Sequence, residues 1–234
     1  MKLRMQITKE KDIRFISHLE YVRTIERAIR RAKIPAAYSE GFNPHMKFSL
    51  ASALGVGVVS YTEFVEIELA EPMEVAQAAA ALSRDLPRGI KVLAADAVDT
   101  HHPALMAQAA GASYRVTVPY DGKIDAAAEA FNAAEQMLFK KAAPKRKEKF
   151  KEIDVKFYIP QIVVQYEDGA VVFNFDCKIT PGGSMKAVDL LNALNEYYEL
   201  QLPVEKADIE RLALYRTDNK GNKLPLLSQT AYKL

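Results

Sequence analysis

Residues 14–49 read RFISHLEYVRTIERAIRRAKIPAAYSEGFNPHMKFS and carry the signals that decide the fold of the first part of the chain. Ser17 to Glu20 has the form Ser-x-x-Glu, the capping box of a helix N-terminus. Apolar residues then recur at helical spacing until Pro35, which ends the pattern. The stretch therefore predicts an amphipathic helix followed by extended segments on either side of a turn at Gly41–His45.

The polar side of this predicted helix is made of arginine. The apolar stripe consists of Val22, Ile25, Ile29 and Ala32. Centred nearly opposite, at 100° per residue, are Arg23, Arg27, Arg30 and Arg31. A guanidinium offers a planar fork of donors that matches phosphate, whereas lysine would serve solubility equally well. The pattern favours a surface that binds an anion, and the alternative is an ordinary solvated charged face.

The remaining periodicity predicts one order of elements twice. Lys2–Thr8 alternates strictly between apolar and polar residues and predicts a strand. Together with the later patterns, this strand gives the element order β-α-β-β-α-β. A second set of elements in the same order follows His101 and His102. Its predicted elements are a strand at 114–119, a helix at 124–139, extended segments at 153–165 and 170–179, a helix at 185–198 and a strand at 209–217. We therefore expect an α+β protein of two ferredoxin-like (βαββαβ) halves with antiparallel sheets, over residues 1–99 and 113–234.

Composition excludes several classes of protein. The 234 residues are 49% hydrophobic, which is ample for a packed core. The chain has no apolar run of about 18 residues and no signal-peptide core, so we expect a cytoplasmic protein without a membrane partner. The single Cys177 rules out an internal disulfide and a four-cysteine zinc site. Because no acidic or histidine cluster has ligand spacing, we expect neither a metal nor a cofactor.

The small net charge of +2 conceals two basic regions. Residues 1–50 hold 11 Lys and Arg against 5 Asp and Glu, and residues 139–156 hold 8 against 3. Two basic patches on an otherwise acidic chain are what a polyanion partner requires. In the second patch, the basic segment 140–156, the candidate phosphate contacts are Lys145, Arg146 and Lys147. The alternative for this segment is a solubilising linker.

Two histidines lie close to the arginines in sequence. His18 falls in the first predicted helical turn, and His45 follows Asn43 and Pro44. Histidine is the natural general acid or base near neutral pH, so the pair could cleave RNA without a metal. The alternatives are a structural hydrogen bond or a contact with phosphate or base. We expect the Gly41–His45 turn to lie beside the start of the helix, with His18, Asn43 and His45 in one pocket.

Four pieces of the sequence carry a resemblance to a known family: RFISHLE, RTIERAIRRAKIP, AYSEGFNPHMKFS and LGVGVVSYTEFVEIEL. Over residues 1–70 the chain resembles the bacterial radical-SAM-linked (radical-SAM-associated) proteins, a domain of uncharacterised function. In that family the domain is found free or attached to a radical-SAM enzyme. This chain lacks the Cys-x-x-x-Cys-x-x-Cys motif that holds the iron–sulfur cluster. The resemblance therefore implies a companion of a radical-SAM enzyme.

A looser similarity, in element order, is to RNA-binding proteins with tandem ferredoxin-like domains, including CRISPR repeat-processing endonucleases. Some of these use a histidine beyond the first helix, about where His45 falls. The glycine-rich loop that this group carries near its C-terminus is not evident here, and its absence weakens the argument for a nuclease. Element order alone does not fix function.

The sequence therefore predicts a non-catalytic RNA-binding accessory protein, and the family resemblance implies that it presents RNA to a radical-SAM partner enzyme. One alternative is a metal-independent ribonuclease that uses His45 and His18, and another is a protein–protein adaptor that docks an acidic partner. In the leading interpretation no residue is catalytic. The candidate nucleic-acid-binding residues are Arg14, His18, Arg23, Arg27, Arg30, Arg31, Asn43, His45, Lys47, Lys145, Arg146 and Lys147.

Overall fold

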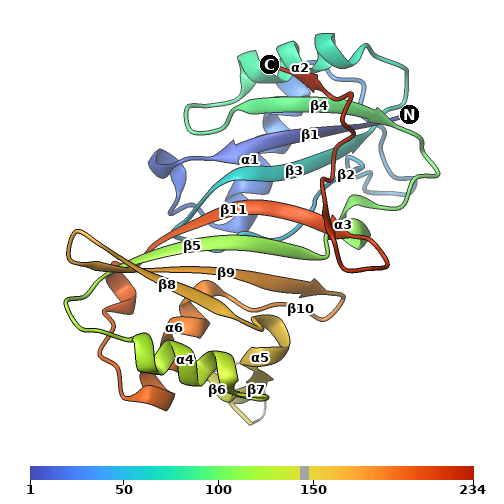
Figure 1. The fold of residues 1–234 in the computed structure, drawn as a ribbon. Helices are drawn as coiled ribbons and strands as arrows, with labels where there is room; N and C mark the ends of the chain where they lie inside the picture. Colours follow the sequence, from blue (N-terminus) through green and yellow to red (C-terminus); the bar gives the residue numbers. More distant parts are fainter. Residues whose placement is uncertain (143–147) are drawn as a thin grey trace. The chain divides into compact units, whose positions relative to one another are not determined.

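The computed structural model describes residues 1–142 and 148–234 (Figure 1). The protein is α+β, and its strand pairing is mostly antiparallel. Contacts divide the chain into unit 1, which contains Met1–Ala110 and Ala213–Leu234, and unit 2, which contains Gly111–Leu212. The sequence predicts a division between residues 99 and 113 and assigns everything after it to the second half. The structure instead groups the last 22 residues with unit 1.

Unit 1 has the order β-α-β-β-α-β in its main elements. These are β1 (Lys2–Lys9), α1 (His18–Arg31), β2 (Phe48–Leu50), β3 (Val58–Glu68), α2 (Val75–Asp85) and β4 (Val92–Val98). A short 3-10 helix at Lys11–Ile13 precedes α1, and a short α3 (Leu105–Gln108) follows β4. The strands lie in the order β4-β1-β3-β2, and each neighbouring pair is antiparallel.

One face of the unit 1 sheet is covered by both helices. The strict alternation in β1 places Leu3, Met5 and Ile7 on this face, each fully buried. Helices α1 and α2 pack into the same apolar cluster, with Ile25 and Leu82 among their buried residues. The strand predicted at Lys2–Thr8 is confirmed by β1.

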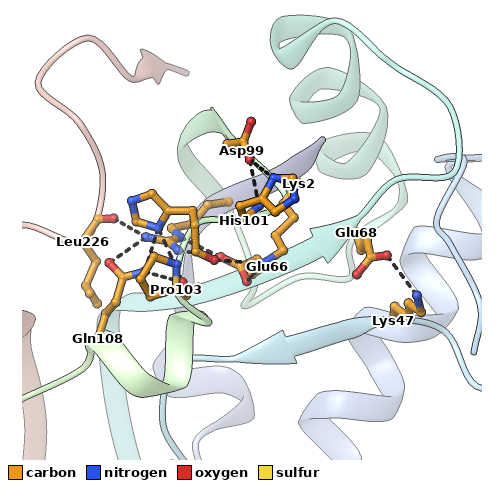
Figure 2. A network of polar contacts seen from close by, with 11 residues as sticks. Lys2, Lys47, Glu66, Glu68, Asp99, His101, Pro103, Gln108 and Leu226 are labelled. Atoms are coloured by element: carbon orange, nitrogen blue, oxygen red, sulfur yellow. Dashed lines mark hydrogen bonds and ion pairs between the residues drawn. The ribbon is translucent and has the colours of Figure 1, made fainter.

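The opposite face of the same sheet carries a buried ion pair. Arg4 of β1 lies directly across from Glu66 of β3, and its Nη2 is 2.5 Å from the Glu66 Oε2. Only 1% of Arg4 and 6% of Glu66 is exposed. The Nη1 of Arg4 also donates to the carbonyl of Leu226 at 3.0 Å and to Gln108 Oε1 at 3.4 Å, so the guanidinium has partners in three segments. Its partners Glu66, Gln108 and Leu226 are labelled in Figure 2.

The C-terminal segment belongs to unit 1 because it is bonded to this sheet at several points. Besides the Leu226 carbonyl on Arg4, the Ser228 amide donates to Asp96 Oδ2 at 3.1 Å. The short β13 (Tyr232–Lys233) pairs with β4, and β12 (Lys223–Leu224) pairs with the end of β11 (Asp208–Thr217). Strands this short leave no periodic pattern in the sequence, and their partners lie too far along the chain to be predicted from neighbouring residues.

Unit 2 is organised around one long strand, β9 (Ala170–Thr180). The other main elements are β5 (Gly111–Pro119), α4 (Asp125–Ala133), β8 (Ile162–Glu167), β10 (Gly183–Ser184), α6 (Ala187–Tyr198) and a 3-10 helix at Val204–Lys206. β5 pairs with one edge of β9, while β8 and β10 pair with the other. Tyr114 stacks on Phe175 across the β5–β9 pair, with ring centroids 5.5 Å apart.

The helix predicted over 124–139 is wrong in its second half. α4 ends at Ala133, and the chain then forms a hairpin of β6 (Leu138–Ala142) and β7 (Phe150–Asp154), followed by a short α5 (Val155–Tyr158). Phe139 lies across from Ile153 in this hairpin, and both side chains are buried. Burial of this cross-strand pair outweighs the helical preference of the alanine-rich stretch.

Replacing Glu66 by alanine should destabilise unit 1 strongly, because it leaves the Arg4 guanidinium buried without its carboxylate. We expect a loss of about 3–5 kcal/mol in the free energy of unfolding, measured by urea denaturation. Glu68 on the same strand is the matched control, since its ion pair with Lys47 (Figure 2) is partly exposed, with 34% of the Glu68 side chain and 46% of the Lys47 side chain accessible to solvent. Glu68→Ala should cost less than about 1 kcal/mol. Equal losses in the two variants would contradict this account.

Candidate nucleic-acid interface

The capping box predicted for the arginine helix is present in α1. The Glu20 amide donates to Ser17 Oγ at 3.2 Å, and the Ser17 amide donates to Glu20 Oε2 at 2.7 Å. The bond from the Ser17 amide, together with that from its hydroxyl, holds the pKa of the Glu20 carboxyl below its usual range. These bonds fix the helix start at His18, which is the first residue of α1 and is half-buried.

The four arginines of α1 are exposed, as the helical spacing predicts. Arg30 forms an ion pair with Glu26 at 2.7 Å, and this contact raises the pKa of the guanidinium. Arg31 lies 3.7 Å from the Asp85 carboxylate and donates to the Asp85 carbonyl at 2.6 Å. The last turn of the helix is therefore partly neutralised by its own neighbours.

The middle of the helix keeps more of its positive charge. Arg23 and Arg27 are four residues apart and so lie on the same side of α1. Arg23 is near enough to Glu20 to lower the pKa of that carboxyl slightly. Within residues 1–142 and 148–234, no ion pair joins Arg27 to a carboxylate. We call these two exposed residues the Arg23–Arg27 pair.

The Gly41–His45 turn is closed by bonds at its base. The Ser39 amide donates to the His45 carbonyl at 2.8 Å, and the His45 amide donates to Ser39 Oγ at 2.9 Å. Gly41 has φ 117°, a conformation that glycine adopts without strain. Phe42, at the tip, is fully exposed. The turn therefore presents an aromatic ring and the side chains of Asn43 and His45 to solvent.

This turn is connected to the end of α1. The guanidinium carbon of Arg30 lies 5.5 Å from the ring centroid of Tyr38, which pairs with Met46 at the base of the turn. His18 is 12 residues earlier, or roughly 18 Å along the helix axis. The pocket expected to hold His18, Asn43 and His45 stays a prediction, and the contact with Tyr38 places the base of the turn nearer the other end of the helix.

The other candidate residues make local contacts. Arg14 is half-buried, and its Nε donates to the Gly57 carbonyl at 3.0 Å. Lys47 is exposed and pairs with Glu68 at 3.0 Å. Lys145, Arg146 and Lys147 lie outside the described residues. The roles predicted for these residues stay predictions.

Sequence patterns missed a second group of charged residues, in unit 2. Lys141 of β6 forms an ion pair with the buried Asp189 of α6 at 2.5 Å, and Lys151 of β7 lies directly across from Lys141. Asp189 is 48 residues from Lys141. The only available signal was the density of lysine in the segment, because the register of the hairpin cannot be read from composition.

The structure holds no candidate for metal chemistry in the part of the chain that it describes. No group of three or more His, Cys, Asp or Glu side chains there is close enough to hold an ion. Burial raises the pKa of the Cys177 thiol to about 11, which leaves it protonated and unreactive at neutral pH. Among the described helices, none is long and apolar enough to cross a membrane.

The sequence matches a known family over most of its length. A bacterial family described as "Uncharacterized protein conserved in bacteria (DUF2344)" matches residues 2–187. The chain belongs to this family. The matched region includes α1, the Gly41–His45 turn and the β6–β7 hairpin, and it ends where α6 begins. No curated protein matches the chain.

Two solved structures show distant similarity. A chain in a crystal structure of a Cbf5-Nop10-Gar1 complex is 12% identical, with a TM-score of 0.47 over 92% of this chain and 50% of that one. This protein thus spans half the length of that chain. A chain described as an unknown protein from Galdieria sulphuraria is also 12% identical, with a TM-score of 0.25 over 90% of this chain and 96% of the other. TM-scores below 0.5 do not establish a shared fold.

Removing the capping hydroxyl should weaken the arginine helix. We expect Ser17→Ala to lower the free energy of unfolding by about 1 kcal/mol, and Ser17→Asp to retain most of it. Because the pKa of Glu20 is lowered in the folded protein, its part of this stability is present above the usual glutamate range and is lost as the pH falls through the lowered value. The difference between wild type and Ser17→Ala, measured by thermal denaturation, should therefore shrink in acid. A difference that grows in acid would contradict the assignment.

Proposed function

We propose that this protein is a non-catalytic RNA-binding accessory protein whose arginine helix holds phosphates. The observation that carries the proposal is the Arg23–Arg27 pair, two exposed guanidinium groups on one side of α1. Each can donate a bidentate pair of hydrogen bonds to a phosphate. The pair lies in the N-terminal basic region, so the surrounding charge favours a polyanion.

The Gly41–His45 turn supplies groups suited to bases. Phe42 is fully exposed, and a free aromatic ring can stack on any base. The Tyr38 ring is partly exposed, and the Arg30 guanidinium lies over it. Sites for single-stranded nucleic acid also combine aromatic rings with arginine. In this proposal Asn43 and His45 contact a base edge or the backbone. Arg14, His18 and Lys47 stay candidate contacts in this proposal.

We also propose that the partner enzyme is a radical-SAM enzyme and that both units are ferredoxin-like. The first part rests on the resemblance of residues 1–70, and the absence of the three-cysteine motif supports a companion role. The second is supported in unit 1 by the antiparallel order β4-β1-β3-β2 with both helices on one face. In unit 2 the hairpin and α5 are additions to the same order of elements.

Removing the Arg23–Arg27 pair should weaken RNA binding irrespective of sequence. We expect Arg23→Gln/Arg27→Gln to lower the affinity for a mixed-sequence single-stranded RNA, measured by fluorescence anisotropy at several salt concentrations. Each lost phosphate contact should also reduce the slope of log K against log salt by about 0.7.

Arg84→Gln/Arg88→Gln is the matched control, since it removes the same charge from exposed positions of unit 1. This control should bind nearly as wild type does. If wild-type protein binds no RNA, or if the two double variants lose affinity equally, the arginine helix is not an RNA-binding surface, and a protein adaptor becomes the better account.

Replacing the turn histidine separates binding from cleavage. We expect His45→Ala to weaken RNA binding severalfold, and neither it nor wild-type protein to cut the RNA, as followed on denaturing gels. A ribonuclease would behave in the opposite way, because the variant would lose cleavage and retain affinity. Wild-type cleavage that disappears in His45→Ala would therefore replace this proposal with the enzymatic alternative.

A further inference from the structure

Two adjoining cavities in unit 2 lie between the β6–β7 hairpin and helix α6. The larger has a volume of about 640 Å³ and is lined by Phe139, Lys140, Asn192 and Glu196, among others. The smaller, of about 120 Å³, is lined by Lys151, Ser184 and Tyr158, among others. Lys141, Ala142 and Asp189 line both cavities, so the ion pair between Lys141 and Asp189 lies at the boundary between them.

The hairpin places two lysines on its inner face. Phe139 and Ile153 lie across from each other and are buried, which shows that this face is turned towards the protein. Side chains two residues along a strand share a face, so Lys141 and Lys151 also point inward. They lie directly across from each other. Two like charges in this position destabilise a strand pair unless an anion lies between them.

The protein supplies one carboxylate for these two ammonium groups. Asp189 is only 6% exposed, and its Oδ2 accepts bonds from Lys141 Nζ at 2.5 Å and from the Lys186 amide at 3.3 Å. Within the described ranges, no ion pair joins Lys151 to a carboxylate. The smaller cavity thus has two lysines and one buried aspartate in its lining, an excess of one positive charge.

A second bond holds the far end of the hairpin on the helix. The Tyr197 hydroxyl donates to the Leu138 carbonyl at 2.6 Å, eight residues along α6 from Asp189. The larger cavity lies between this bond and the Lys141–Asp189 ion pair. Its walls are therefore tied at both ends, and Asn192 and Glu196, both exposed, offer an amide and a carboxylate to a ligand.

We propose that the smaller cavity binds a phosphate group through Lys151 and Lys141, and that the larger cavity holds the nucleoside to which that phosphate is attached. The smaller volume is about four times that of a water molecule in the liquid, enough for a phosphate. The amide and carboxylate beside it suit sugar hydroxyls and base edges. The phosphate can come from a free nucleotide or from RNA, and the site does not require the arginine helix to bind RNA.

The test uses the full-length protein and Lys151→Gln, with Lys206→Gln as the matched control. Lys206 is exposed in the same unit and lines neither of the two cavities. Adenosine monophosphate, adenosine and a short RNA with or without a 5′-phosphate are titrated by calorimetry. We expect adenosine monophosphate to bind wild type and the control. Lys151→Gln should bind about tenfold more weakly, the loss of one charge-assisted contact to phosphate.

Comparison of these ligands distinguishes the two sources of phosphate. Tighter binding of adenosine monophosphate than of either RNA indicates a free nucleotide, and tighter binding of RNA indicates nucleic acid. If Lys151→Gln weakens neither ligand relative to Lys206→Gln, or if adenosine binds as tightly as its monophosphate, the proposal is overturned. Neither result depends on the Arg23–Arg27 pair, so this site and the RNA-binding surface of unit 1 succeed or fail separately.

Thermal denaturation provides a readout that a structural lysine would not give. Because Lys151 faces another lysine, Lys151→Gln without ligand should have the same melting temperature as wild type or a higher one. Adenosine monophosphate should raise the melting temperature of wild type more than that of the variant. A lower melting temperature for the free variant, together with an unchanged shift on addition of adenosine monophosphate, would show that Lys151 stabilises the hairpin and does not bind the ligand.

Discussion

The ion pair between Arg4 and Glu66 holds together segments that lie far apart in the sequence. It joins the two central strands of unit 1, and the same guanidinium bonds to Gln108 and to the Leu226 carbonyl. A buried guanidinium must satisfy its donors, so the linker after β4 and the C-terminal segment both contribute to burying this ion pair. The charged face of β1 therefore connects the sheet to segments that its apolar face does not reach.

Local sequence signals were sufficient for much of this unit. The alternation in Lys2–Thr8 and the capping box at Ser17 both depend on residues only a few positions apart, and both appear as predicted. The hairpin at 138–154 and the return of residues 213–234 to the first sheet depend on partners far along the chain. Periodicity cannot report such contacts, and the alanine-rich stretch before the hairpin favours a helix on propensity alone.

The candidate sites divide in the same way. Helical spacing placed the arginines on an exposed side of α1, but it did not show that Arg30 and Arg31 are partly neutralised by Glu26 and Asp85. Lysine content marked the second basic region without revealing that two of its lysines face each other across a hairpin. In both places, the charge that remains for a partner is set by which carboxylates the fold brings near. That information resides in tertiary contacts.

The short β13 has a consequence for how molecules of this protein meet one another. Tyr232 and Lys233 pair with β4, and the Leu234 amide donates to the Leu93 carbonyl at 3.0 Å. β4 would otherwise present a row of open backbone donors and acceptors, which is a template for strand addition by a neighbouring molecule. Tyr232 and Lys233 occupy part of that edge with the backbone of the same chain. This pairing reduces the backbone edge that a neighbouring molecule could extend. Such extension of a sheet between molecules is the first step towards fibrous aggregation.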